Sequence, residues 1–419
     1  MSKTACIPVI AAALCVLGFG STGAVAQDGG SGLPEWLQKE LDREVKRRGK
    51  SRSVELFDGM LSSTVKAKEK IESVAYDWGE GFLVNFGSKN TPAECYAYDG
   101  DSNSATLLSN IAEVGIQNVL EANGASLKSR TIQSVIVDHV GAQPIMALEW
   151  FLIIEKAEGE QLAAQTKAAV AVIDKTSVAC IHTEMGYSKS FLQMFVEFVE
   201  NASTSTDDIS PYYQELYLVQ LNDQAVGFAK MDYVRDEEGD SRIVSVESSA
   251  FAADRSTLST SDGYSYEWST PQGGLINAYS ANVENGELTM QLDLSRDEND
   301  IWGVKGNIQG KEYATELPDV STIESGLRQI QTVRDVIGDA ERTEGDLIAW
   351  IPDADPAALT RVTFNQDEDN MSGTLSLGPL VMKTKIAGDG TISEMASDLG
   401  GMTMTMTRVW SEGEVPPIE

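Results

Sequence analysis

The chain has 419 residues, of which 42% are hydrophobic, and this is enough material for about two or three domains with cores of their own. Its 64 acidic residues outnumber its 32 basic residues and give a formal net charge of −32. Such a surface repels nucleic-acid phosphates and anionic lipid head groups, so nucleic-acid binding is excluded, and solubility is the simplest reason for the acidity.

Residues 1–26 have the composition of a secretory signal peptide. Lys3 precedes an apolar run from Ala5 to Phe19, and small residues end the segment at Ala26. The run is shorter than the roughly 20 residues that span a bilayer, which favours cleavage near Ala26 over a membrane anchor. Lipidation at Cys15 is disfavoured because Leu14 precedes it. The mature chain is therefore expected to be periplasmic or secreted, without a transmembrane segment.

Two cysteines remain after such cleavage, Cys95 and Cys180. In an exported protein the simplest expectation is a disulfide between them. Closing a loop of this length stabilises a fold by about 4 to 5 kcal/mol in the chain-entropy model, provided that the two Cα atoms come within about 7 Å. The pair is therefore predicted to be structural.

The mature chain begins with a helical pattern. Between Pro34 and Arg48, apolar residues recur every four positions, at Leu37, Leu41 and Val45. A second helix is expected from Val54 to Lys70. Residues 27–70 are therefore predicted to form an N-terminal helical segment.

Residues 71–203 are predicted to form an α-β-α sandwich. Strands are expected near 81–86 and 94–98, a helix over 104–120, and four β-rich runs between 129 and 183. A closing amphipathic helix follows, with Phe191, Met194, Phe195 and Phe198 on one stripe. This order of elements favours an antiparallel sheet with helices on its faces.

The polar residues at 204–211 are predicted to be a linker, and the pattern changes after them. Over 212–411, alternating strands are separated by turn dipeptides, which indicates a large antiparallel curved sheet or open barrel. These dipeptides are Asn222-Asp223, Glu238-Gly239, Asn285-Gly286 and Asp389-Gly390. One helix is expected from Thr322 to Ile337, with Ser321 and Glu324 as a capping box. Residues 412–419 are a tail, and the fold class is α+β.

Two family resemblances follow from these elements. Residues 71–200, in which Cys180 to Tyr187 lead from the last strand into a helix, resemble the α-β-α sandwich of PsbP-like proteins. Residues 212–411 resemble the half-barrel of periplasmic lipoprotein carriers, through long hairpins such as Gly274 to Leu294, the inserted helix and the ending Met402 to Trp410. The resemblances imply non-catalytic binding proteins or assembly factors.

The methionines at the end of the chain are the first candidate binding residues. Met402, Met404 and Met406 alternate with threonines and share one face of a predicted strand that continues to Trp410. They could line an adaptable apolar pocket, be part of an ordinary core, or bind Cu(I). Core packing is the commonest outcome for such residues, and a pocket is the next.

A second constellation lies on one face of the strand that carries Cys180, His182 and Glu184. With Cys95 or His139 it could bind zinc or form a thiol nucleophile. A disulfide beside a hydrogen-bonded histidine is the favoured alternative, because export oxidises thiols. No catalytic sequence motif is present, although paired carboxylates of a hydrolase stay an open alternative.

Asp99, Asp101 and Asn103 match the first three ligand positions of a calcium loop. The sixth position is Ser104 instead of glycine, and the twelfth is Asn110 instead of glutamate. Turn formation and helix capping explain the same residues, so neither a metal nor a cofactor is predicted.

The sequence supports three functional hypotheses. The first is a non-enzymatic envelope protein that binds an apolar ligand, a lipid or a lipoprotein acyl chain, in its C-terminal β domain. The second is an interaction or assembly module whose N-terminal sandwich presents a surface to an envelope protein. The third is a hydrolase that uses buried carboxylates or the Cys180 and His182 pair.

Overall fold

The computed structural model describes residues 35–45, 49–87, 92–99, 103–205, 210–318, 322–339, 341–368 and 371–416. The chain folds into two compact units. Of the described residues, the N-terminal unit contains 35–205 together with 250–260, and the C-terminal unit contains 210–249 and 261–416. The predicted signal peptide lies outside the described residues. Among the residues described, no helix has both the length and the apolar composition that a bilayer crossing requires.

The beginning of the N-terminal unit is less helical than the sequence pattern predicts. Helix α2 spans Glu35–Leu41 only. The helix predicted over 54–70 is wrong, because these residues form a hairpin of β1 (Lys50–Leu56) and β2 (Leu61–Ala67). Burial alternates with a period of two along both strands, and the turn between them includes Asp58 at a φ of 54°. The short strand β10 (Ser203–Thr204) pairs with β2.

A seven-stranded antiparallel sheet forms the centre of this unit, in the order β3-β4-β5-β9-β8-β7-β6. Its strands are β3 (Ser73–Tyr76), β4 (Gly79–Asn85), β5 (Pro92–Asp99), β6 (Ala125–Val140), β7 (Gln143–Lys156), β8 (Gln161–Ile173) and β9 (Thr176–His182). Within this described sheet, β3 and β6 are the edge strands.

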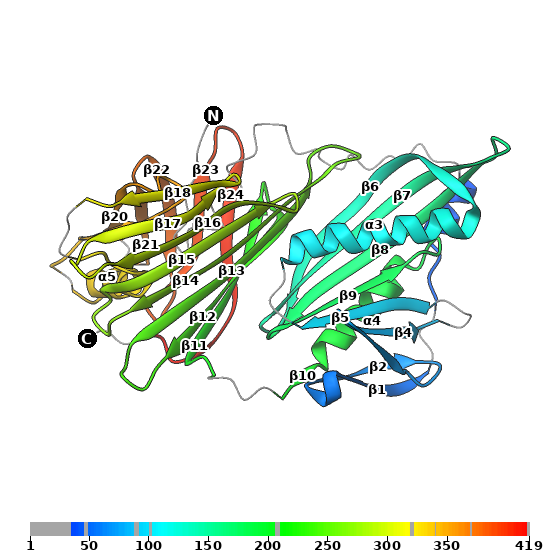
Figure 1. The fold of residues 1–419 in the computed structure, drawn as a ribbon, viewed down its shortest axis with the longest axis horizontal. Coiled ribbons are helices and arrows are strands. Elements are labelled where there is room, and N and C mark those ends of the chain that lie inside the picture. The colour runs from blue at the N-terminus through cyan, green and yellow to red at the C-terminus, as the bar shows by residue number, and fades with distance from the viewer. Residues whose placement is uncertain are drawn as a thin grey trace. The chain divides into compact units, whose positions relative to one another are not determined.

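A helix packs against each face of this sheet. Helix α3 (Ser104–Asn123) lies over β6 to β9, where Gly115 comes close to Thr166 and Ile181 (Figure 1). Helix α4 (Ser188–Glu200) packs on the opposite face, where Phe82 stacks on Phe198 in the main core. Because α3 covers only part of the sheet, no helix among the described residues lies over β3, β4 and β5 on its side.

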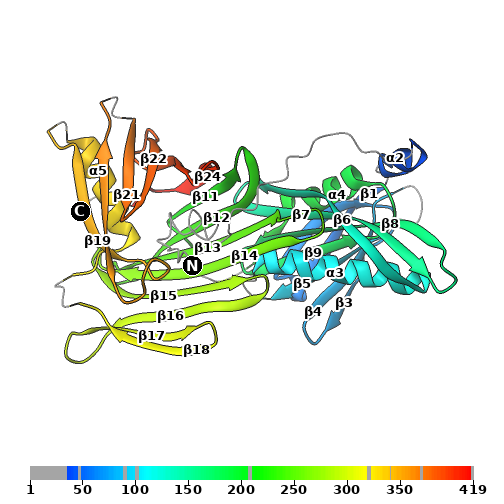
Figure 2. The same cartoon turned by 90° about the horizontal axis from the view of Figure 1, so that it is seen from above.

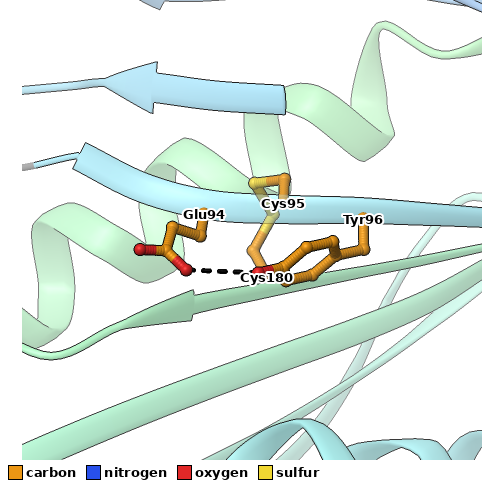
Figure 3. Close-up of a disulfide and its surroundings, with 4 residues drawn as sticks. All are labelled: Glu94, Cys95, Tyr96 and Cys180. Atoms are coloured by element: carbon orange, nitrogen blue, oxygen red, sulfur yellow. Dashed lines mark hydrogen bonds between the residues drawn. A yellow bond between two sulfur atoms is a disulfide. The ribbon is translucent and has the colours of Figure 1, made fainter. Parts of the chain in front are cut away.

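The predicted pair of cysteines is joined in the structure. Cys95 on β5 and Cys180 on β9 are direct neighbours in the strand register, with an S–S distance of 2.04 Å and a Cα–Cα distance of 4.0 Å. Both side chains are buried in the core on the α4 side of the sheet (Figure 3). The disulfide therefore links two strands that are 85 residues apart in sequence.

The C-terminal unit is one large antiparallel sheet with a single described helix. Its 14 strands are ordered β18-β17-β16-β15-β14-β13-β12-β11-β24-β23-β22-β21-β20-β19, so β11 pairs with β24 and, among the described residues, no ladder closes the sheet into a barrel. The strands are β11 (Tyr213–Leu221), β12 (Gln224–Arg235), β13 (Ser241–Ala252), β14 (Leu258–Ser269), β15 (Leu275–Glu284), β16 (Glu287–Arg296), β17 (Trp302–Ile308), β18 (Lys311–Glu316), β19 (Glu344–Trp350), β20 (Leu359–Gln366), β21 (Ser372–Leu377), β22 (Leu380–Ile386), β23 (Ile392–Asp398) and β24 (Thr403–Gly413).

Helix α5 (Gly326–Gly338) packs on β19 and β20 (Figure 2). It begins later than predicted, and the proposed capping residue Ser321 lies outside the described residues. Glu324 is not helical, because it forms a bridge with Gly274 and its carboxylate accepts the backbone N–H of Ile348 at 2.7 Å. The first turn of α5 is instead capped by Glu267 of β14, which accepts the N–H of Gly326 at 2.7 Å.

Candidate functional site

The uncovered side of β3, β4 and β5 carries a cluster of large apolar side chains that we call the aromatic face. Its members are Val74, Tyr76, Trp78, Leu83, Tyr96 and Tyr98. Four of them are half exposed or more: Val74 (55%), Tyr76 (50%), Trp78 (50%) and Leu83 (56%). An exposed cluster of this kind is typical of an interaction site in a folded protein.

The rings of the aromatic face are packed on one another. Tyr76 and Trp78 are stacked, with ring centroids 4.9 Å apart and planes that differ by 1°. Trp78 also lies 5.4 Å from Tyr98 and 5.8 Å from Tyr96, measured between ring centroids. Because each ring supports the next, the cluster presents an ordered surface to solvent.

An open depression of about 620 Å³ lies beside these rings. Its lining combines Val74, Tyr76, Leu83 and Tyr96 with the charged residues Glu69, Lys70, Glu72 and Glu94. The Tyr96 hydroxyl donates to the Glu94 carboxylate at 3.2 Å (Figure 3), and Asn118 of α3 donates to the same oxygen at 3.3 Å. Burial and the nearby Glu94 charge raise the pKa of Tyr96 to about 12, so the hydroxyl stays protonated.

A second cluster is buried beneath α4. Glu149 on β7, Lys167 on β8 and His182 on β9 are successive partners across three strands. The Lys167 ammonium donates to the carbonyl of Glu184 at 2.6 Å and to Gln165 Oε1 at 3.2 Å. Burial lowers the pKa of Lys167 to about 8, although the charge of Glu149 opposes the shift.

His182 has an unusual environment at the end of this row. It is 2% exposed, and neither ring nitrogen has a hydrogen-bond partner. Phe86, Tyr187 and Phe191 surround the ring at centroid distances of 5.1, 5.9 and 6.0 Å. Burial, with the positive charge of Lys167, lowers the pKa of His182 to about 2. His182 is therefore a neutral residue of the core. The prediction that its ring is hydrogen-bonded is wrong.

Residues 35–45, which we call the N-terminal strap, pack against the N-terminal end of α4. The carboxylate of Glu44 accepts the backbone N–H groups of Lys189 and Ser190, each at 2.9 Å. The Arg43 carbonyl accepts the N–H of Tyr187 at 2.6 Å, and its guanidinium lies 4.7 Å from the Tyr187 ring centroid. The strap thus caps the helix that covers the buried row.

The C-terminal unit contains a buried carboxylate network. Glu215 on β11 is 2% exposed and accepts hydroxyl hydrogen bonds from Tyr217 at 2.9 Å, Tyr233 at 3.0 Å and Tyr213 at 3.2 Å. Burial raises the pKa of Glu215. The hydrogen bonds from the three tyrosines and the positive charge of Arg408, whose guanidinium lies 3.6 Å away, oppose this shift. A buried network in which each polar group has a hydrogen-bond partner fixes the positions of the side chains that form it.

A small cavity adjoins this network and measures about 20 Å³. It is lined by Glu215, Tyr217, Gln329, Ile330, Val333, Gly390, Thr391 and Ile392. A cavity of this size holds about one water molecule, and its lining is partly polar.

The predicted methionine pocket residues do not line this cavity. Met404 and Met406 on β24 are 2% and 0% exposed and lie opposite Leu221 and Val219 of β11. Met402 and Trp410 are partly buried on the same end of the chain. The structure places Met404 and Met406 within the packed interior, which agrees with the core alternative among those that the sequence leaves open.

The other predicted residues are not brought together into a metal or nucleophile site. Cys180 is bonded to Cys95, which leaves it without a thiol. His139 is partly buried, with its Nδ1 3.1 Å from the Gly141 carbonyl oxygen. Asp101 and the side chain of Asp99 lie outside the described residues, and Asn103 precedes α3 without a side-chain capping hydrogen bond. Within the described ranges, no group of three or more potential ligands could hold a metal ion.

The aromatic face was missed in the sequence. Tyr96 and Tyr98 alternate with buried Cys95 and Ala97 on β5, and this pattern predicts one apolar and one wet side. A row of tyrosines on the supposed wet side was the signal that could have shown it. What the sequence could not show is that Trp78 reaches them from another strand pair.

Taken together, the described residues define a mostly β protein of two units, one with helices on a seven-stranded sheet and one with an open 14-stranded sheet and a single helix. The chain matches no known family model and no curated protein sequence.

Several solved structures resemble it weakly. A β-barrel-like protein of a domain of unknown function, DUF1849, from Brucella abortus is 13% identical, with a TM-score of 0.32 over 48% of this chain and 98% of that one. The Ran-binding protein Mog1p of Saccharomyces cerevisiae is 14% identical, with a TM-score of 0.26 over 38% and 96%. Cyanobacterial PsbP from Synechocystis sp. PCC 6803 is 8% identical, with a TM-score of 0.24 over 44% and 100%. These values are too low to carry a functional argument.

Proposed function

We propose that this protein is an interaction module of the cell envelope that docks a partner protein on the aromatic face of its N-terminal unit. The observation that carries the proposal is the half-exposed, stacked pair of Tyr76 and Trp78 beside a depression of about 620 Å³. Ordered aromatic rings are rich sources of binding energy at interfaces, because they bury much area at little entropic cost.

The geometry of the sheet supports this choice. Helix α3 covers β6 to β9, whereas no helix in the described part of the chain lies over the same face of β3 to β5. The Cys95–Cys180 bond holds β5 to β9 directly behind this face. A rigid sheet with a preformed aromatic surface loses little conformational entropy when a partner binds.

The location belongs to the same proposal. The predicted signal peptide, with cleavage near Ala26, would export the chain, and a disulfide is stable in an exported protein.

Binding of a lipid or lipoprotein chain in the C-terminal unit, as in periplasmic lipoprotein carriers, stays a prediction. The cavity beside Glu215 measures about 20 Å³ and includes the polar side chains of Glu215 and Gln329. An acyl chain needs a far larger apolar space. The geometry therefore favours partner docking over ligand carriage.

Site-specific photocrosslinking in the native envelope tests the proposal. A photoreactive phenylalanine analogue replaces Leu83 on the aromatic face or, as a control, Val381 on β22, which are 56% and 52% exposed. We expect a discrete protein adduct at Leu83 that disappears in the Trp78→Ala background. Identical adducts at both positions, or an adduct insensitive to Trp78→Ala, would contradict docking on this face.

A further inference from the structure

The charges around the aromatic face are predominantly negative. Glu69, Glu72 and Glu94 line the depression, and Asp77 separates Tyr76 from Trp78 along the chain. The one basic residue in the lining, Lys70, is paired with Glu72 at 3.1 Å. An acidic rim around aromatic rings favours a cationic partner, and the net charge of −32 attracts such a partner over longer distances.

Elsewhere in the described structure, arginine side chains pack on tyrosine and tryptophan rings. Among the described residues, five arginine side chains lie over such rings, with the guanidinium carbon 4.7 to 4.8 Å from the ring centroid. The pairs are Arg43–Tyr187, Arg130–Trp150, Arg235–Tyr212, Arg242–Tyr266 and Arg296–Trp302. In the part of the chain that the structure describes, none of these arginines lies over a ring of the aromatic face.

Strand β3 provides a second binding element beside the rings. It is an edge strand of the described sheet, and all four of its residues, Ser73–Tyr76, are exposed. An edge strand has backbone N–H and C=O groups that can pair with an added strand. Such an added strand would run along Val74 and Tyr76, which belong to the aromatic face.

We infer that the aromatic face binds an extended, arginine-bearing segment of a partner protein, which pairs with the edge of β3 and packs a guanidinium group against the exposed part of the stacked Tyr76 and Trp78 pair. The inference rests on the proposed function and specifies the chemistry of the partner. Arginine fits better than lysine, because its planar and weakly hydrated guanidinium stacks on a ring while its N–H groups stay free to donate to a carboxylate.

Peptide binding to the mature chain tests this inference. The probe is a fluorescent eight-residue peptide of alternating valine and arginine, and its binding is followed by anisotropy at about 0.15 M salt, where long-range attraction is screened. Three matched peptides replace arginine by lysine, replace arginine by the neutral isostere citrulline, or carry N-methyl groups that block strand pairing.

We expect the citrulline and N-methylated peptides each to bind about tenfold more weakly than the arginine peptide, and the lysine peptide to lie between them and arginine. Trp78→Ala should weaken binding of the arginine peptide about tenfold. The matched control is Trp36→Ala, because Trp36 on α2 is also exposed (64%) and lies outside the aromatic face. It should leave binding unchanged.

Equal binding of the arginine and citrulline peptides, or equal loss in the Trp36→Ala and Trp78→Ala variants, would overturn the arginine contact. Full binding of the N-methylated peptide would overturn pairing with β3. These results are distinct from failure of the proposed function, which would show as loss of the Leu83-specific adduct in the envelope. A Leu83 adduct with no preference for the arginine peptide would reject the inference alone.

Discussion

Gly81 lies directly beneath the ring of Tyr76. A Cβ atom at position 81 would come within 2.9 Å of Tyr76 Cε2 and 3.5 Å of Tyr96 Cδ1, so the absence of a side chain lets both rings lie flat on β4. Aromatic side chains commonly cover a glycine on a neighbouring strand in this way. The shape of the aromatic face therefore depends on a residue that contributes no side chain to it.

Gly81→Ala should weaken partner docking without unfolding the protein. The new methyl group displaces the half-exposed Tyr76 ring from its stack with Trp78, so binding of the arginine peptide should fall several-fold. Because the ring lies at the surface, the melting temperature should fall by only a few degrees. Gly303→Ala is the control, because a Cβ there has no neighbour within 4 Å. Unchanged peptide affinity in Gly81→Ala would show that the ring arrangement does not matter.

His182→Phe should make the protein more resistant to acid. The unfolded state binds a proton at His182 below about pH 6.5, whereas the folded state, with a pKa of about 2, does not, so this residue lowers stability as the pH falls from 6.5. A phenylalanine also removes two unpartnered nitrogens from an aromatic pocket. We expect a gain of about 1 to 3 kcal/mol at pH 4.5 in urea unfolding.

The measurement is urea unfolding of the wild type and His182→Phe at several pH values between 7 and 4.5. If the wild type and His182→Phe lost stability in parallel between pH 7 and pH 4.5, the buried neutral state of His182 would be refuted.

Glu267→Gln should stabilise the C-terminal unit at alkaline pH. Burial raises the pKa of Glu267 to about 7, so between pH 4.5 and 7 the folded state holds a proton that the unfolded state has lost, and stability falls as the pH rises through this window. Glutamine stays neutral and can still accept the N–H of Gly326. We expect a gain of about 1 to 3 kcal/mol at pH 8 and little difference at pH 4.

The measurement is urea unfolding of both proteins across this pH range. Glu284→Gln, at an exposed position near the end of β15, controls for loss of one negative charge. Equal stability of wild type and Glu267→Gln at pH 8 would mean that the carboxylate has no raised pKa.

Removal of the disulfide should destabilise the N-terminal unit. The bond closes a separation of 85 residues, for which the chain-entropy model gives about 4 to 5 kcal/mol. The Cys95→Ala/Cys180→Ala double variant should therefore unfold at lower urea concentration, as should the reduced wild type. An unfolding midpoint that does not respond to reduction would show that the bond adds no stability.

Glu44→Ala should release the N-terminal strap from α4. The carboxylate accepts two backbone N–H groups at the start of the helix, and loss of such a cap costs about 1 kcal/mol. Hydrogen exchange should accelerate in the first turn of α4 and in α2. Glu40→Ala, which removes only a surface ion pair with Arg43, should change neither segment. Equal protection in both variants would exclude a capping role for Glu44.

The sequence by itself determined the local elements in which one periodicity dominates. Phe191, Met194, Phe195 and Phe198 specified an amphipathic helix that forms, and the Asn285-Gly286 dipeptide specified a hairpin turn whose φ angles of 51° and 81° are observed. Of the four cysteines, two lie beyond the predicted signal peptide, and this was enough to predict that Cys95 and Cys180 pair.

Only the tertiary structure decided which surfaces these elements leave open. Residues 54–67 have apolar positions that suit either period, and pairing of β1 with β2 selected the strand. Trp78 joined Tyr96 and Tyr98 because β4 pairs with β5, and His182 lost its hydrogen bonds because Phe86 and Phe191 enclose it. Contacts between residues distant in the chain depend on sheet register and helix placement. Both are set by the packing free energy of the whole chain, so no short segment of sequence determines them.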